Sequence, residues 1–171
     1  MSDQGFEKAV KILDSLEPIG PRTQLLPRSI CQAVVDRIDN EPKECGGPAA
    51  VEITARLLRN YPDFKAHDAK GYVVALKELF AVYPVTICYR ATGKDGLPGK
   101  LQFVPKTADV KKALGDEIKR RDLIRANALW HMQEADNRAK QRQAEAEFNA
   151  KYPNAETRRR QVAELLGARQ L

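Results

Sequence analysis

Two clusters of basic side chains are the residues of this sequence best suited to binding chemistry. The first lies within one predicted helix and comprises Lys119, Arg120, Arg121 and Arg125. The second is an uninterrupted run further along the chain: Arg158, Arg159 and Arg160. Such cations neutralise phosphates, which supplies most of the affinity of proteins for nucleic acid. They also attract the acidic surface of another protein.

The two clusters differ in the acids around them. Asp116, Glu117 and Asp122 flank the first cluster, at the three- and four-residue spacings that form ion pairs along one helix. The first cluster therefore indicates a solvated helix face, with nucleic-acid contacts as the alternative. Only Glu156 and Glu164 lie near the second cluster. That run fits nucleic acid and an acidic protein surface equally well.

The residues that could act as nucleophiles or metal ligands are few and widely separated. They are three cysteines and two histidines: Cys31, Cys45, Cys88, His67 and His131. The sequence has no Cys-x-x-Cys pair, no phosphate-binding loop, no nucleophile elbow and no His-Glu-x-x-His helix. We therefore expect no catalytic residue, metal site or cofactor, and we predict that the protein is not an enzyme. His131 falls in a polar helix, which predicts a solvated or interface histidine.

The composition fits a modest core with much charged surface. Of the 171 residues, 43% are hydrophobic and 30% charged, and the formal net charge of +6 favours an acidic partner. The first residues lack the basic and apolar regions of a signal peptide. No apolar run approaches the roughly 20 residues that span a bilayer. We expect a cytoplasmic protein in a reducing compartment, without membrane contact.

Helical periodicity organises the middle of the sequence, and its best-defined element runs from Asp68 to Tyr83. Its apolar residues recur at three- and four-residue steps: Tyr72, Ala75, Leu76, Leu79, Phe80 and Tyr83. Asp68 is the predicted N-cap, and Pro84 cannot continue the helix. Similar stripes predict helices at 6–17, 27–39, 48–60 and 85–91.

Two features of the central sequence lie outside these helices. The glycine-rich stretch 92–99 predicts an exposed loop, with a hairpin that returns along 101–104 as the alternative. Tyr61, Tyr83 and Phe103 stand at helix ends or beside prolines. We expect these three aromatic rings to fill the core rather than to stack on bases.

From Thr107, the predicted N-cap, helical sequence continues for some forty residues with Gly115 as its interruption. Its apolar stripe is thin beyond Arg121, where it runs through Ile124, Ala128, His131 or Met132, and Ala135. This part predicts a projecting helix, a partner-dependent coiled coil or a partly frayed segment. We predict an all-α fold: a compact multi-helix domain with a long projecting C-terminal helix. The predicted parts are a helical pair and linker (1–47), a central helical domain (48–118) and a C-terminal helix with an amphipathic tail (119–171).

A series of short motifs runs through the central part. A helix ends in Tyr-Pro-x-Phe at 61–64, the next carries Tyr72, Leu76 and Tyr83, and Phe103-Val104-Pro105 precedes Thr107-Ala108-Asp109-Val110. This order resembles the small helical helicase loader and inhibitor proteins of phages and prophages, in which an aromatic-x-Pro-(Thr)-x-Ala-Asp/Glu-aliphatic run opens a helix. There the aromatic ring docks in the core, proline fixes the chain, and threonine caps the helix.

The resemblance implies a protein without ATPase activity that grips a hexameric replicative helicase and restrains it. It would deliver the helicase to an origin-bound initiator, in the cytoplasm of a bacterial host if the chain is phage-encoded. The tail is the expected docking segment. Its anchors would be three apolar residues: Val162, Leu165 and Leu166. Arg158, Arg159 and Arg160 would steer it toward an acidic partner.

Two other functions fit the same sequence. A nucleic-acid-binding regulator would use the cations of both clusters, with Lys119, Arg120, Arg121 and Arg125 as its possible contacts, and would bind DNA with a steep dependence on salt. A phage structural or assembly protein would oligomerise through the long helix.

Overall fold

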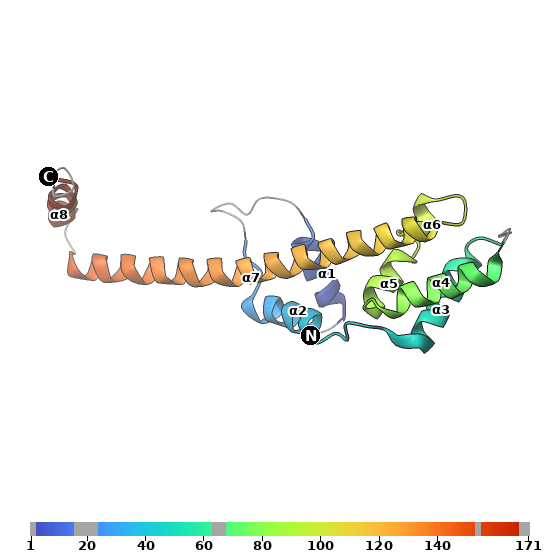
Figure 1. Cartoon of the computed structure of the whole chain (residues 1–171). Coiled ribbons are helices and arrows are strands. Elements are labelled where there is room, and N and C mark those ends of the chain that lie inside the picture. Colours follow the sequence, from blue (N-terminus) through green and yellow to red (C-terminus); the bar gives the residue numbers. More distant parts are fainter. Residues whose placement is uncertain (1–2, 16–23, 63–67, 153–154, 168–171) are drawn as a thin grey trace.

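The computed structural model describes residues 3–15, 24–62, 68–152 and 155–167, and all the regular secondary structure in these ranges is helical (Figure 1). The all-α prediction is confirmed. The helices are α1 (Asp3–Leu13), α2 (Arg28–Asp39), α3 (Gly46–Arg59), α4 (Ala69–Ala81), α5 (Val85–Ala91), α6 (Leu97–Lys100), α7 (Thr107–Lys151) and α8 (Ala155–Gly167). At 1.5 Å per residue, the 45 residues of α7 extend over about 68 Å.

α4 forms as its periodicity predicts. The Asp68 carboxylate accepts a hydrogen bond from the backbone N–H of Gly71 at 2.8 Å, which caps the helix. Leu76 and Phe80 are completely buried, and α4 packs along α3. Pro84 ends this helical hairpin and serves as the N-cap of α5.

The first hydrophobic cluster joins α3, α4 and α5 to the beginning of α7, and we call it the central cluster. Its fully buried large side chains are Ile53, Leu57, Leu76, Phe80, Val110 and Leu114. Two tyrosines at its edge hold the connection between α6 and α7. The Tyr72 hydroxyl donates to the Pro105 carbonyl at 2.5 Å, and the Tyr61 hydroxyl donates to the Leu101 carbonyl at 3.4 Å.

The second hydrophobic cluster, the N-terminal cluster, joins α1 and α2 to the middle of α7. Its buried residues are Leu13, Cys31, Val34, Val35, Ile124, Ala128 and Met132. The thin apolar stripe of α7 is therefore the surface on which α1 and α2 pack. Because both clusters draw on α7, the helix is a shared support for two groups of helices (Figure 1). The boundaries at residues 47 and 118 stay predictions.

Phe103 does not fill the core, and this prediction is wrong. Its side chain is 82% exposed, whereas Val104 is half-buried and Pro105 fully buried. The Tyr72 bond to the Pro105 carbonyl fixes this short segment against the central cluster. Val104 and Pro105 occupy the inward positions of the segment, which leaves Phe103 pointing outward.

Two details of the predicted helix boundaries are also wrong. The stretch 92–99 is not an exposed loop, because α6 begins at Leu97 and that side chain is only 5% exposed. The N-cap of α7 is Lys106 rather than Thr107. The Asp109 carboxylate accepts a hydrogen bond from the Lys106 backbone N–H at 2.9 Å, which ties the first turn to the residue before it.

Candidate functional site

The first basic cluster lies on α7 where this helix crosses the ends of α1 and α2. Arg120 binds Asp14, just after α1, with its Nε 2.7 Å from one carboxylate oxygen. Arg125 holds Asp39, the last residue of α2, through two hydrogen bonds of 2.7 and 2.9 Å. The fourth member, Lys119, is exposed and forms no ion pair within the described part of the chain.

These arginines offset unfavourable charges at helix ends. A carboxylate at the C-terminus of a helix meets the negative end of the helix dipole, and both Asp14 and Asp39 occupy such positions. The hydrogen bond from Arg120 lowers the pKa of Asp14 below its ordinary value, and the hydrogen bond from Arg125 does the same for the pKa of Asp39. Both carboxylates therefore stay ionised and fasten α1 and α2 to α7.

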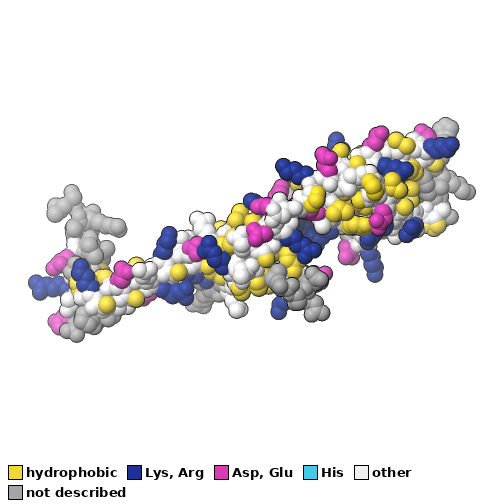
Figure 2. Space-filling model, turned by 90° about the horizontal axis from the view of Figure 1, so that it is seen from below, with side chains coloured by type: hydrophobic (Ala, Val, Ile, Leu, Met, Phe, Trp, Pro, Cys, Tyr) yellow, Lys and Arg dark blue, Asp and Glu magenta, His cyan; other side chains and the backbone are white. Residues whose placement is uncertain are grey.

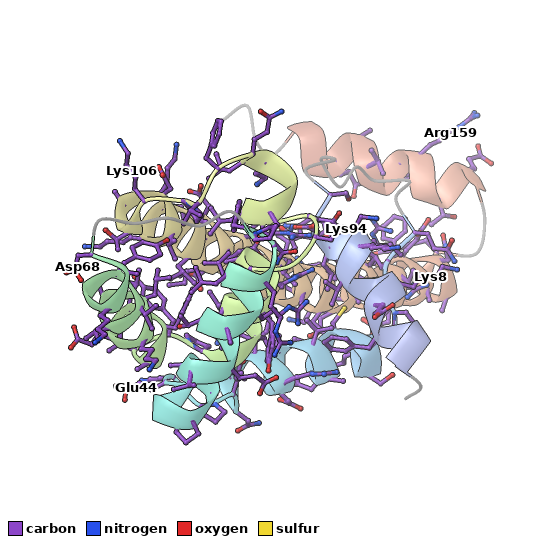
Figure 3. All side chains as sticks on the ribbon, turned by 90° about the vertical axis from the view of Figure 1, so that its right-hand side faces the viewer. Lys8, Glu44, Asp68, Lys94, Lys106 and Arg159 are labelled. Carbon is purple, nitrogen blue, oxygen red and sulfur yellow. The ribbon has the colours of Figure 1, made fainter. Side chains whose placement is uncertain are left out.

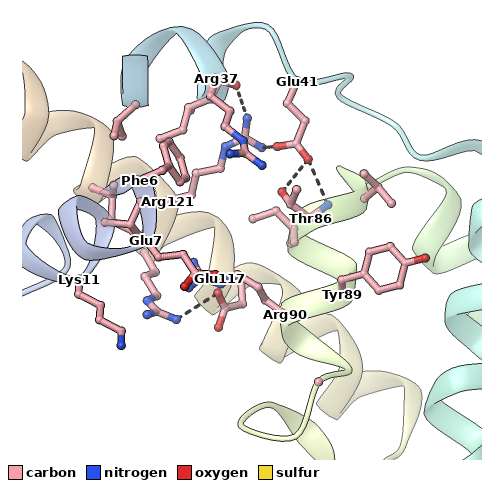
Figure 4. Close-up of a pocket in the computed structure, with 18 of the residues that line it drawn as sticks. Phe6, Glu7, Lys11, Arg37, Glu41, Thr86, Tyr89, Arg90, Glu117 and Arg121 are labelled. Carbon is pink, nitrogen blue, oxygen red and sulfur yellow. Dashed lines mark hydrogen bonds and ion pairs between the residues drawn. The ribbon is translucent and has the colours of Figure 1, made fainter. Parts of the chain in front are cut away.

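Arg121 and Glu41 form the most buried of these pairs. The Arg121 guanidinium lies 2.9 Å from the Glu41 carboxylate, and the two side chains are only 18% and 12% exposed. Arg121 also donates to the Ile38 carbonyl at the end of α2. Glu41 in turn accepts from the backbone N–H and the hydroxyl of Thr86, at 3.1 and 2.6 Å, in the first turn of α5. Glu41 thus connects α5 to α7 (Figure 4).

An open groove of about 1080 Å³ lies beside this contact, between α1 and α2 on one side and α5 on the other (Figure 4). Its lining includes apolar side chains from all four surrounding helices: Phe6, Val10, Ile38, Val85, Ile87 and Ile124. Six cations and four acids also line it, namely Lys11, Arg37, Arg90, Lys94, Arg120 and Arg121 with Glu7, Glu41, Asp95 and Glu117. The groove is therefore apolar inside with a charged border.

His131 is a buried structural residue rather than a solvated one. Its side chain is 3% exposed, and its Nδ1 accepts a hydrogen bond from the Leu26 backbone N–H at 3.3 Å. Burial lowers the pKa of His131, and the nearby charge of Arg138 lowers it further. The neutral ring is thus the form that joins α7 to the chain just before α2.

Two of the three cysteines meet in space although they are far apart in sequence. The thiols of Cys45 and Cys88 both donate to the Phe80 carbonyl, at 3.2 and 3.6 Å. Burial raises the pKa of Cys45, and it raises the pKa of Cys88 to about 12. Both thiols are therefore protonated near neutral pH and are poor nucleophiles. Among the described residues, no three His, Cys, Asp or Glu side chains group in a way that could hold a metal ion.

The last 13 residues of α7 extend beyond both hydrophobic clusters as a bare helix, which we call the arm (residues 139–151). Every residue from 139 to 147 is exposed. Positive, negative and uncharged polar side chains alternate along it, whereas hydrophobic side chains gather over the other helices (Figure 2). Near its end, the rings of Phe148 and Tyr152 lie 5.0 Å apart. The arm leads directly to α8 (Figure 1).

α8 carries the second basic cluster and the predicted anchors. Val162 is 44% exposed. Arg159 is exposed and points away from the other helices (Figure 3), and Arg160 forms an exposed ion pair with Glu164 at 3.7 Å. The side chains of Arg158, Leu165 and Leu166 lie outside the described part of the structure. The anchor role of these residues stays a prediction.

Comparison of the chain with known protein families, curated proteins and solved structures found no match. The resemblance to helicase loaders therefore stays a prediction. Within the described residues, no helix is both long enough and apolar enough to cross a membrane.

The sequence interpretation missed the acids that face the first basic cluster. It considered partners three or four residues away, and one such pair exists, between Arg120 and Glu117 at 3.6 Å. The closer carboxylates come from α1, α2 and the segment after α2. Their position at predicted helix ends is the signal that could have identified them, because a carboxylate there needs a cation.

Proposed function

We propose that this chain is a non-enzymatic accessory protein of DNA replication that binds a hexameric replicative helicase and loads or restrains it. The observation that supports this proposal best is the arm with α8 at its end. Two hydrophobic clusters fix the rest of α7, and the arm holds α8 beyond them as a separate segment. Such a segment suits docking on a large partner better than enclosing a small substrate.

The proposed contact uses α8 as an amphipathic helix. An isolated helix of 13 residues is marginal in water, so binding to a groove of the partner would stabilise it. Val162, Leu165 and Leu166 would provide apolar anchors, while Arg158, Arg159 and Arg160 would raise the association rate toward an acidic surface. An origin-bound initiator would then receive the helicase.

Gel filtration with the replicative helicase of the native host tests this function. At micromolar concentrations, the full chain should elute with the helicase. The double variant Val162→Asp/Leu165→Asp should elute separately, because charges replace two apolar anchors. Ala144→Asp is the matched control, since it adds a charge to an exposed position of the arm and should leave co-elution intact. Failure of the full chain to co-elute would refute the proposal.

Nucleic-acid binding by the first basic cluster has less support. Arg120, Arg121 and Arg125 each hold a carboxylate of the same chain, which leaves less positive charge to neutralise phosphates. Lys119 is the member of the cluster that remains available.

A further inference from the structure

The groove between α1, α2 and α5 combines an apolar interior with a positive border. Its volume of about 1080 Å³ exceeds the roughly 300–1,000 Å³ that is typical of small-molecule sites. The interior draws on Val10 and Ile38 from one wall, Val85 from the other and Ile124 from α7. Because these residues belong to helices of both clusters, the site exists only in the assembled fold.

The charged residues of the groove do not balance one another. Arg120 is paired with Asp14 and Glu117, and Arg121 is paired with Glu41. The other cations are four exposed side chains that form no ion pair with any described residue: Lys11, Arg37, Arg90 and Lys94. Only two acids in the lining are likewise unpaired, Glu7 and Asp95. The surplus positive charge is distributed over both walls.

Two of these cations have defined surroundings, and the other two lie on opposite walls. The Arg37 guanidinium lies over the ring of Phe6, 4.4 Å from the ring centroid. The face of the guanidinium therefore contacts the ring, while the N–H groups at its edge can still donate hydrogen bonds to a ligand. Arg90 lies close enough to Asp14 to lower the pKa of that carboxyl, after the larger effect of Arg120. Lys94 follows α5 on the opposite wall from Lys11 on α1.

We propose that this groove binds an acidic amphipathic segment of a partner protein. An apolar interior is covered well by aliphatic side chains that recur on one face of a helix. A border with unpaired lysines and arginines favours carboxylates on the two flanks of that helix. This inference rests on the proposed function in so far as the ligand is a segment of another protein.

Two other occupants suit the groove less well. The chain's own α8 has three arginines against two glutamates, and its charge would be repelled by the border. A nucleic acid would satisfy the cations, but its phosphates would leave the apolar interior uncovered. Charge and apolar surface together therefore favour an acidic protein segment.

Selection from a random library of displayed 12-residue peptides on the immobilised full chain tests this proposal. Enriched peptides should carry several Asp or Glu residues, with apolar residues at helical spacing. Their affinity is then measured by fluorescence anisotropy against the wild-type chain and two variants. Lys11→Glu/Lys94→Glu reverses one charge on each wall of the groove. Lys111→Glu/Lys112→Glu makes the same change at exposed positions of α7 outside it.

We expect the groove variant to bind the enriched peptides at least tenfold more weakly, and the control variant to bind them within twofold of wild type. Enrichment of neutral or basic peptides, no enrichment, or equal losses in the two variants would overturn the proposal. A single-stranded oligonucleotide that binds in the groove instead, with its binding abolished by the Lys11→Glu/Lys94→Glu change, would also overturn it.

The outcome is separable from that of the helicase experiment. The variant Val162→Asp/Leu165→Asp leaves every groove residue unchanged, so it should bind the enriched peptides like wild type. Peptide binding by a chain that never co-elutes with the helicase would support the groove while refuting the helicase proposal. The reverse result would refute the groove alone.

Discussion

Arg121 differs from its neighbours on α7 because its charge is withdrawn from water. Its partner Glu41 is 12% exposed and also binds Thr86, whereas the Arg125–Asp39 pair is 40% and 43% exposed. Breaking a buried pair leaves an uncompensated charge, whereas an exposed pair is screened by solvent. The two arginines should therefore contribute very differently to stability.

Replacing Arg121 with Ala should lower the free energy of unfolding by about 2 kcal/mol. The matched change Arg125→Ala should lower it much less, because that pair lies in solvent. Urea unfolding followed by circular dichroism measures both values. Similar losses in the two variants would show that the contact between Arg121 and Glu41 is not the stronger link.

His131 should make stability depend on pH in the mildly acidic range. Burial lowers its pKa in the folded state, so the unfolded chain binds a proton first as the pH falls below about 6.5. The free energy of unfolding therefore decreases from pH 6.5 toward pH 5, and is recovered as the pH rises. The lowered pKa values of Asp14 and Asp39 also decrease the free energy of unfolding as the pH falls, but only at lower pH, below the ordinary carboxyl value of 3.8.

The variant His131→Gln removes the titrating group and should flatten this part of the stability curve. Urea midpoints at half-unit steps between pH 5 and pH 6.5 provide the measurement. The other histidine, His67, is present in both proteins, so its contribution cancels in the comparison. An unchanged slope in the variant would exclude His131 as the source.

The sequence identifies the residue types of the site but not their partners. Arg120 and Asp14 are separated by 106 positions, and no local periodicity relates them. Conversely, Asp68 caps the helix that begins right after it, because that bond depends only on the next three residues. The local cap at Asp68 was therefore predictable, whereas contacts made by packing distant helices were not.

At the scale of the helix, two glycines should respond to the same substitution in opposite ways. A methyl group at Gly115, within α7, would meet nothing within 4 Å. Alanine there should raise the free energy of unfolding by roughly 0.5–1 kcal/mol, since glycine is the costlier residue inside a helix. This change corresponds to a rise of about 1–4 °C in Tm, measurable by calorimetry.

Gly96 is the contrasting case, just before α6. A methyl group there would collide with the backbone oxygens of Arg90 and Ala91, which cannot move as a flexible side chain can. Gly96→Ala should therefore lower the free energy of unfolding by at least about 1 kcal/mol. A stable Gly96→Ala protein would mean that α6 does not pack closely on the end of α5.

The same short element shows where helix prediction fails. α6 has four residues, too few for a periodic apolar pattern, and its Pro98 and Gly99 are typical of loops. Its one strong signal is Leu97, which is buried in the central cluster. Phe103 failed for a related reason, because a short non-helical segment has no apolar period that separates its inward side chains from its outward ones.

For the whole molecule, the main consequence of the structure is that α7 belongs to the core over much of its length. α1 and α2 pack on residues 124–132 of α7, well beyond the part of that helix that contributes to the central cluster. The thin stripe was visible in the sequence, yet its few apolar residues do not by themselves identify the helices that pack on them. Only the outer part of the predicted projecting helix, from about residue 139, projects.

This distribution predicts where the chain can be shortened. A chain that ends at Ala139 keeps every buried residue of both clusters, as well as the ion pairs of Asp136 and Arg138. It should therefore unfold cooperatively with nearly the stability of the full chain. A chain that ends at Arg121 loses Ile124, Ala128 and Met132, and α1 and α2 should detach from it. Hydrogen exchange of α2 amides distinguishes the two, with slow exchange expected only in the longer chain.

Light scattering of the full chain and of the chain that ends at Ala139 distinguishes a helicase accessory protein from an oligomerising structural protein. If the arm only carries α8, the full chain and the chain ending at Ala139 should have the same number of subunits per particle at all concentrations. The shorter chain should then differ only in its smaller hydrodynamic radius, because it lacks about 18 Å of helix and all of α8. A concentration-dependent oligomer that disappears on this truncation would instead assign the arm to self-association, since its exposed polar surface would then be an interface between copies.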